Sequence, residues 1–257
     1  MTVSITNTVR DLAVGIPGAT RIFEQMGIDY CCGGGRTLAD ACNRFSIPID
    51  QVVTELESAS RLTDLDRQSR DWRSESLAAL SAHIVETHHV YTKQELIRLE
   101  TLLDKVCSRH GANHSELPLL REVFLHLKQD LIPHMLREEQ VLFPYIARME
   151  EAVTNQREIP PPFFGTVQNP VRMMATEHDT AGDMLRELRQ ISGNYTPPAD
   201  ACISYQTLYQ ALAEFEADLH QHIHLENNVL FPRAVEMETQ GNPGWQTMVG
   251  NHVCAGH

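Results

Sequence analysis

Two segments of this 257-residue chain share the pattern H-x-x-x-E-x-x-V-L-F-P. The first contains His134 and Glu138, and the second contains His222 and Glu226. A histidine and a glutamate four residues apart lie on the same face of a helix, one turn from each other. A single such pair is usually an exposed ion pair. Two copies with the same apolar continuation instead favour a metal site, to which each copy contributes an imidazole and a carboxylate.

Two further histidines extend this pattern into a duplication. His89 lies 45 residues before His134, and His178 lies 44 residues before His222. We expect each half to be a helical hairpin that packs against the other half, because neither hairpin can bury its apolar face by itself. The four imidazoles and the two carboxylates would then face one interior.

These ligand types favour a pair of non-haem iron or manganese ions. A carboxylate has two oxygens and can bridge two cations, which suits a duplicated set of ligands. Imidazole and carboxylate ligands with open positions favour iron or manganese, and zinc fits less well. Without a metal, such a set would be expensive to bury. The predicted ligands are His89, His134, Glu138, His178, His222 and Glu226.

Neighbouring histidines and glutamates are predicted to face elsewhere. Successive residues of a helix point about 100° apart, so side chains one or two positions from a ligand leave its face. The residues excluded in this way are His88, Glu139, His220 and His224. His110 is kept as a candidate for an extra ligand, because it falls near the end of the helix that carries His89.

Apolar periodicity predicts the elements that must position these residues. Amphipathic helices are expected at about 74–108, 116–149, 168–192 and 200–238, and their connections favour an all-α, up-down-up-down four-helix bundle. Pro144 and Pro232 are predicted to kink or end their helices. The expected organisation is a small helical cysteine-containing domain at 1–62, a charged linker at 63–73, the bundle at 74–240 and a tail at 241–257.

Composition excludes several classes of partner. The net charge is -13 and no Lys/Arg-rich run occurs, which argues against nucleic acid and against an anionic membrane surface. No apolar run is long enough to span a membrane, and the first residues do not form a secretory signal. We therefore expect a cytoplasmic protein whose six cysteines are reduced, catalytic or metal-binding rather than a disulfide framework.

Cys31 and Cys32 stand directly before three glycines. A disulfide between adjacent residues would be strained, because their Cα atoms are only about 3.8 Å apart. With Cys42 the segment offers three thiols but lacks the spacing of a structural zinc site. A helix is predicted to begin soon after, and its N-terminus can favour a thiolate. The pair is therefore predicted to consist of reactive thiols, and the alternative is two small residues in a glycine-rich turn.

Together these motifs resemble the hemerythrin-like iron–sulfur cluster repair di-iron proteins, also called the repair-of-iron-centres family. The resemblance rests on Gly27–Gly35 in the N-terminal part and, in the bundle, on His89, on the two H-x-x-x-E segments and on "NPVRMMATEHDTAG". It covers about residues 5–235. The family pairs a small N-terminal domain, which carries a Gly-Ile-Asp-Tyr-Cys-Cys-Gly-Gly-Gly type of motif, with a hemerythrin-like bundle.

The resemblance implies a centre of two non-haem irons with oxo and carboxylate bridges. The implied ligands are His89, His134, His178 and His222, with Glu138 and Glu226 bridging. It also implies a role in restoring iron–sulfur proteins damaged by oxidative or nitrosative stress, and it suggests a homodimer. We expect the centre to supply iron. Two alternatives remain open: reduction of nitric oxide or a related nitrogen oxide at the di-iron site, and a sensor or carrier that binds dioxygen or nitric oxide.

Overall fold

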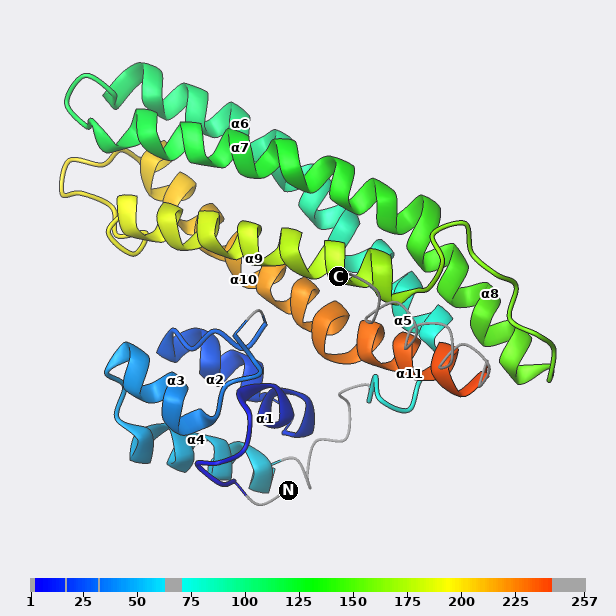
Figure 1. The fold of residues 1–257 in the computed structure, drawn as a ribbon. Helices are drawn as coiled ribbons and strands as arrows, with labels where there is room; N and C mark the ends of the chain where they lie inside the picture. The colour runs from blue at the N-terminus through cyan, green and yellow to red at the C-terminus, as the bar shows by residue number, and fades with distance from the viewer. Residues whose placement is uncertain (1–2, 17, 32, 63–70, 242–257) are drawn as a thin grey trace, which may run out of the picture.

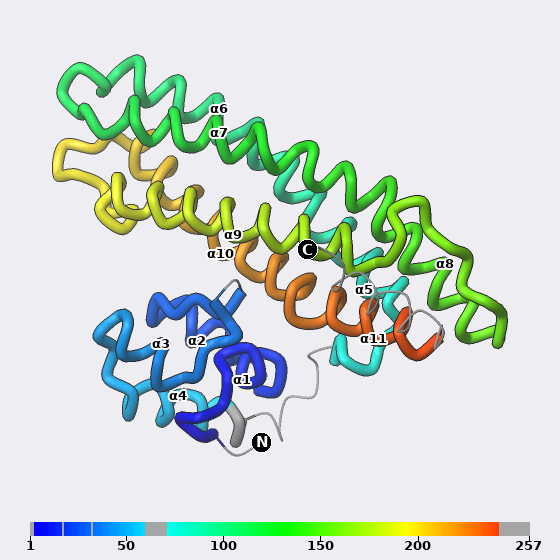
Figure 2. Tube along the Cα trace, viewed as in Figure 1, coloured from blue at the N-terminus to red at the C-terminus, as the bar shows by residue number. Residues whose placement is uncertain are grey.

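A computed structural model describes residues 3–16, 18–31, 33–62 and 71–241 of the chain. A small helical domain lies beside a long helical bundle (Figure 1). The tube in Figure 2 follows the same path, with the small domain against the side of the bundle that carries α10. The described residues form no strand and only one isolated β-bridge, between Thr8 and Thr37. The predicted all-α class is confirmed.

Four helices form the small domain. Thr8 and Thr37 begin the first and third helices, where their side chains accept hydrogen bonds from the backbone N–H groups of Asp11 and Asp40, so each satisfies a free donor at a helix start. The four helices pack around one apolar core. Their bounds are α1 Val9–Gly15, α2 Ala19–Met26, α3 Leu38–Phe45 and α4 Ile49–Leu62.

Four continuous helical rods form the bundle, close to the predicted ranges. Three of these rods contain a short π-helical turn, in which backbone hydrogen bonds span five residues instead of four. The first rod is α5 (Leu77–His83), η1 (Ile84–His89) and α6 (Val90–His110); the second is α7 (Glu116–Arg137), η2 (Glu138–Leu142) and α8 (Phe143–Thr154); the third is α9 (Gln168–Ile191); the fourth is α10 (Ile203–Leu225), η3 (Glu226–Leu230) and α11 (Phe231–Gly241). The predicted four-helix bundle is confirmed.

The two prolines of the repeated pattern follow the π turns after one intervening residue. Pro144 and Pro232 are the second residues of α8 and α11. The backbone N–H of Phe143 bonds to the carbonyl of Glu138, five residues back, and Phe231 bonds to Glu226 in the same way. Of the two outcomes predicted at these prolines, a kink or a helix end, the helix end is not found, because both helices continue past them. The wider turn continues the helix up to a residue that has no N–H to donate.

The bundle has two apolar cores, one toward each end. The first contains the Leu96–Leu103 stretch of α6 packed on α7, α9 and α10. The second contains Leu77, Leu142 and Leu230 from the other end. All six predicted ligands occupy the segment between these cores, so apolar side chains cover the centre on both sides.

The described end of the predicted linker is attached to the bundle. The Arg233 guanidinium donates hydrogen bonds to the carbonyls of Trp72 and Glu75, at 2.8 and 2.7 Å. The Trp72 ring also stacks on His83. Residues 63–70 of that linker and most of the predicted tail lie outside the described residues. Among the helices that the structure does describe, none is both long and apolar enough to cross a membrane.

Candidate metal centre

The six predicted ligands lie together in the middle of the bundle. They form two groups of four potential ligand atoms, and within each group the atoms all lie within 4.8 Å of one another. One group contains His89 and His222, and the other contains His134 and His178. Glu138 and Glu226 belong to both groups. All six side chains are buried.

The π turns place three of these six residues. Glu138 and Glu226 are the first residues of η2 and η3, and His89 is the last residue of η1. A π turn widens a helix locally and is frequent at functional sites, because it re-aims side chains without ending the helix. His134 and His222 lie four residues before the glutamates, on regular α-helix, and His178 lies on α9, which has no π turn.

The imidazoles face one another and the carboxylates through their Nε2 atoms. The Nε2 atoms of His89 and His222 are 3.0 Å apart, and those of His134 and His178 are also 3.0 Å apart. Glu226 places one oxygen 3.0 Å from Nε2 of His222 and the other 3.1 Å from Nε2 of His178. The two oxygens of one glutamate therefore point toward different pairs of histidines.

The opposite ring nitrogens of three histidines have oxygen partners that the spacing argument missed. Nδ1 of His89 lies 2.7 Å from Glu139 and Nδ1 of His134 lies 2.7 Å from Glu177. Nδ1 of His178 lies 2.9 Å from Oδ1 of Asn227. A carboxylate or amide oxygen only accepts, so each of these Nδ1 atoms is the donor, and Nε2 is the nitrogen left to face a metal.

The sequence offered one signal that could have identified these partners, which is that each is next to a predicted ligand. Glu139 follows Glu138, Glu177 precedes His178, and Asn227 follows Glu226, so each partner is the chain neighbour of a predicted ligand. Of the three, only Glu139 was considered from the sequence, as a residue one position off the ligand face. A side chain that leaves the ligand face of its own helix can reach Nδ1 of a histidine on the next helix, and spacing along one helix does not indicate such a contact.

Charge inside the cluster fits a bound cation. Both carboxylate oxygens of Glu138 are buried without a hydrogen-bond partner among the described residues. Burial opposes a charge on His89, but the carboxylates of Glu138 and Glu226 outweigh it and raise the pKa of His89 to about 10. In the absence of a metal, protons on the imidazoles compensate the negative charge of the two carboxylates. A cation bound by the imidazole nitrogens and the carboxylates would neutralise that charge in place of the protons.

Three of the residues excluded from the ligand set contact other parts of the molecule. Nδ1 of His88 lies 3.0 Å from Asp218, on the outer side of the His222 ring. His220 lies 2.8 Å from Glu24 of the small domain, and the ring of His224 packs edge-on against Tyr30 of that domain. The helix that carries His222 and Glu226 on its inner face therefore binds the small domain with its outer face.

The structure does not bring His110 to the cluster. Its Nε2 lies 3.1 Å from Sγ of Cys202, beside the ring of Tyr205. His110 lies 21 residues beyond His89 along one continuous rod, which is about 30 Å at 1.5 Å per residue. The expectation of an extra ligand is wrong because the end of the predicted helix is remote from its metal-binding part.

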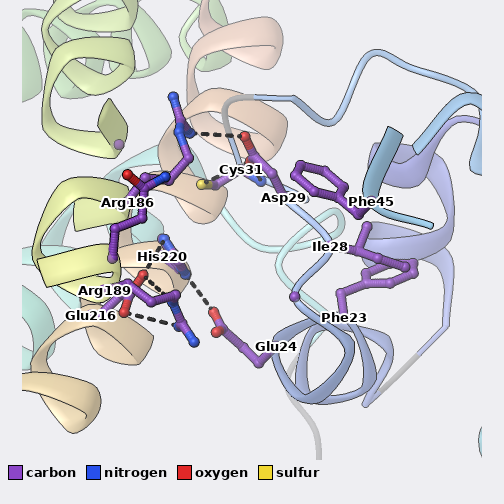
Figure 3. Close-up of a pocket in the computed structure, with 13 residues that line it drawn as sticks. Phe23, Glu24, Ile28, Asp29, Cys31, Phe45, Arg186, Arg189, Glu216 and His220 are labelled. Atoms are coloured by element: carbon purple, nitrogen blue, oxygen red, sulfur yellow. Dashed lines mark hydrogen bonds and ion pairs between the residues drawn. The ribbon is translucent and has the colours of Figure 1, made fainter. Parts of the chain in front are cut away.

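Cys31 faces the bundle at the edge of a cavity of about 250 Å³ between the two domains (Figure 3). The Cys31 side chain is buried, and its Sγ lies 3.4 Å from a carboxylate oxygen of Asp29. A neighbouring carboxylate disfavours a thiolate, so this contact stabilises the neutral thiol. Cys32, the other predicted reactive thiol, lies outside the described residues.

Charged groups from both domains close this cavity. The Asp29 carboxylate lies 3.7 Å from the Arg186 guanidinium, and Glu24 lies 2.8 Å from His220. Figure 3 shows Arg186, Arg189, Glu216 and His220 on the bundle side and Phe23, Glu24, Ile28, Asp29 and Phe45 on the side of the small domain. The glycine-rich motif therefore lies at the contact between the domains.

Comparison with known families agrees with this fold and centre. The family model described as hemerythrin HHE cation binding domain matches residues 80–234. A second model, described as a domain of unknown function (DUF542), matches residues 5–60. The bundle is thus a hemerythrin-type cation-binding domain, and its buried histidines and glutamates suit that class.

Relatives of the full chain define the family more narrowly. The chain is 36% identical over 235 residues to a probable iron–sulfur cluster repair protein of Haemophilus influenzae, and the alignment covers 88% of this chain and 95% of the relative. It is also 36% identical over 227 residues to the iron–sulfur cluster repair protein YtfE of Yersinia pseudotuberculosis, with coverage of 88% and 96%. The chain belongs to this family of iron–sulfur cluster repair proteins, as the motifs predicted.

Proposed function

We propose that this protein helps to repair iron–sulfur clusters damaged by oxidative or nitrosative stress, by supplying iron from the centre in its bundle. The relatives named as repair proteins support the role, and they do not favour the nitric oxide reductase or the sensor. The observation that carries the proposal is the buried cluster itself. Glu138 and Glu226, both fully buried, face four imidazoles in the interior of the bundle.

The ligand set divides into two metal positions. His89 and His222 would hold one iron, and His134 and His178 would hold the other. Glu138 and Glu226 would bind both ions, since each belongs to both groups. Support for two ions comes from this sharing, because a carboxylate with one oxygen toward each histidine pair can join two cations.

Residues around the ligands orient the imidazoles and keep water away from the centre. Bound iron would supply a redox-active centre and the ion to be delivered. Glu139, Glu177 and Asn227 hold three imidazoles with the Nε2 lone pair directed inward. The apolar cores on both sides exclude water, which strengthens the attraction between carboxylates and cations.

Transfer of labelled iron tests the proposal. The holo-protein, loaded with isotopically labelled ferrous iron, is mixed with an iron–sulfur enzyme whose four-iron cluster has been oxidised to a three-iron form. One ferrous ion and one electron restore that cluster, so a chemical reductant is included. We expect labelled iron in the repaired cluster and recovery of enzyme activity, both faster than with an equal amount of free iron. Repair no faster than with free iron would refute iron delivery.

A further inference from the structure

The four histidines of the centre differ in whether Nδ1 has a hydrogen-bond partner. His89, His134 and His178 each donate Nδ1–H to an oxygen of a neighbouring side chain. Nδ1 of His222 is buried and has no hydrogen-bond partner among the described residues. Metal-binding histidines almost always donate their second N–H to an acceptor, which sets the tautomer and the direction of the ring.

The other ring nitrogen of His222 faces the metal positions. Nε2 of His222 lies 3.0 Å from a carboxylate oxygen of Glu226 and 3.0 Å from Nε2 of His89. A histidine that binds a metal through Nε2 carries its proton on Nδ1, and at His222 this buried N–H would have no acceptor among the described residues. The other three rings each have an acceptor at Nδ1.

The internal duplication explains where the missing partner belongs. Residues 87–89 read Thr-His-His and residues 176–178 read Thr-Glu-His. Glu177 of the second copy supports His134, so the equivalent position of the first copy, His88, is the one that would support His222. The His88 ring instead lies parallel to the His222 ring, with centroids 5.8 Å apart, and its own Nδ1 contacts Asp218. A ring face offers no acceptor comparable to a carboxylate.

We infer that the two metal positions hold iron with unequal strength, and that the ion between His89 and His222 is the one released for delivery. This inference rests on the proposed function. Loss of a partner behind a metal ligand typically costs 10- to 100-fold in affinity. The ion between His134 and His178, whose ligands both have partners, remains bound as the weaker one leaves.

Release to a chelator measures the difference. Full-length protein carrying two ferrous ions is mixed anaerobically with excess chromogenic iron chelator, and the colour is followed with time. We expect two phases of equal amplitude whose rates differ by 10- to 100-fold. A single phase containing both ions would overturn the inference.

Reciprocal substitutions at the paired positions assign the phases. His88→Gln offers Nδ1 of His222 an oxygen, and its amide N–H can still bond to Asp218, so the fast phase should slow at least several-fold. Glu177→His copies the arrangement of the first half into the second, so the slow phase should accelerate 10- to 100-fold. Unchanged rates in both variants would contradict the role of these partners.

A neighbouring pair of asparagines provides the matched control. Asn227→Ala removes the partner of His178 and should accelerate the slow phase alone. Asn228→Ala removes a contact with the Tyr30 carbonyl of the small domain and should leave both phases unchanged. Acceleration of the fast phase by Asn227→Ala would reverse the assignment and overturn the inference.

Variants with one ligand removed give an independent assignment. His222→Ala should retain one slowly released iron, and His178→Ala should retain one rapidly released iron, with helicity checked by circular dichroism. The opposite pattern would overturn the inference even if both proteins fold. Two unequal phases without any transfer to a damaged cluster would instead refute the proposed function and leave the unequal binding intact.

Discussion

Replacing Glu138 by glutamine tests whether one carboxylate serves both metal positions. Glu138 is fully buried, and neither of its oxygens has a hydrogen-bond partner among the described residues. Glutamine has nearly the same shape but is neutral, and only one of its two terminal atoms can bind a cation. We expect Glu138→Gln to hold at most one iron per chain and the unaltered protein to hold two.

The expected effect on thermal stability follows from binding linkage. A ligand that binds only the folded state at 100 times its dissociation constant adds about 2.7 kcal/mol to the free energy of unfolding. For a domain of this size, each kcal/mol raises the melting temperature by about 2–4 °C. Two such ions would add about 5.4 kcal/mol. Iron should therefore raise the melting temperature by roughly 10–20 °C in the unaltered protein and by about half as much or less in Glu138→Gln.

Iron analysis and circular dichroism under anaerobic conditions measure both quantities on the same samples. Glu139→Gln is the matched control, because Glu139 is the adjacent residue and a glutamine there still presents an oxygen to Nδ1 of His89. This control should bind two irons and show most of the thermal shift. If Glu138→Gln bound two irons with the full shift, Glu138 would not be a shared ligand and the reasoning would be refuted.

Three further predictions concern residues outside the ligand set. His110→Ala should retain two irons by metal analysis, since this residue lies far along its rod; loss of an iron would show that it contributes to the centre. Glu238→Ala should lower the free energy of unfolding by about 2–3 kcal/mol in urea titrations. The reason is that the backbone N–H of Val167, 3.0 Å from this buried carboxylate, loses its acceptor. A change below 0.5 kcal/mol, the scale of an ordinary surface substitution, would contradict this prediction. A double-mutant cycle on Glu24 and His220 should give a coupling energy of about 1 kcal/mol for this half-buried pair between the domains, and additive effects would show that the contact does not stabilise the docked arrangement.

The cluster of four histidines and two glutamates was accessible from sequence because it depends on local geometry. A spacing of four residues places His134 and Glu138 on one helix face whatever the rest of the chain does. The duplication supplied the second pair and located His89 and His178 on the partner helices. The same reasoning was wrong for His110, because periodicity predicts the face of a helix but not which parts of two long helices meet.

The supporting residues depended on contacts between helices. Glu139 reaches His89 across 50 positions of sequence, and Glu177 reaches His134 across 43. No helical periodicity connects such positions. The π turns belong to the same category, because packing between helices decides where one extra residue in a turn is tolerated.

The sequence by itself determined the helical class, the duplication and the chemical type of the centre, because helix periodicity and ligand chemistry act over a few residues. Only the tertiary structure decided which ring nitrogen faces the metal positions, and that His88 gives His222 no acceptor where Glu177 supports His134. It also decided that the glycine-rich cysteine motif docks on the outer face of the helix that carries His222 and Glu226. The physical reason is that hydrogen bonds between side chains depend on distances of a few tenths of an ångström between separate helices, which packing of the whole bundle establishes.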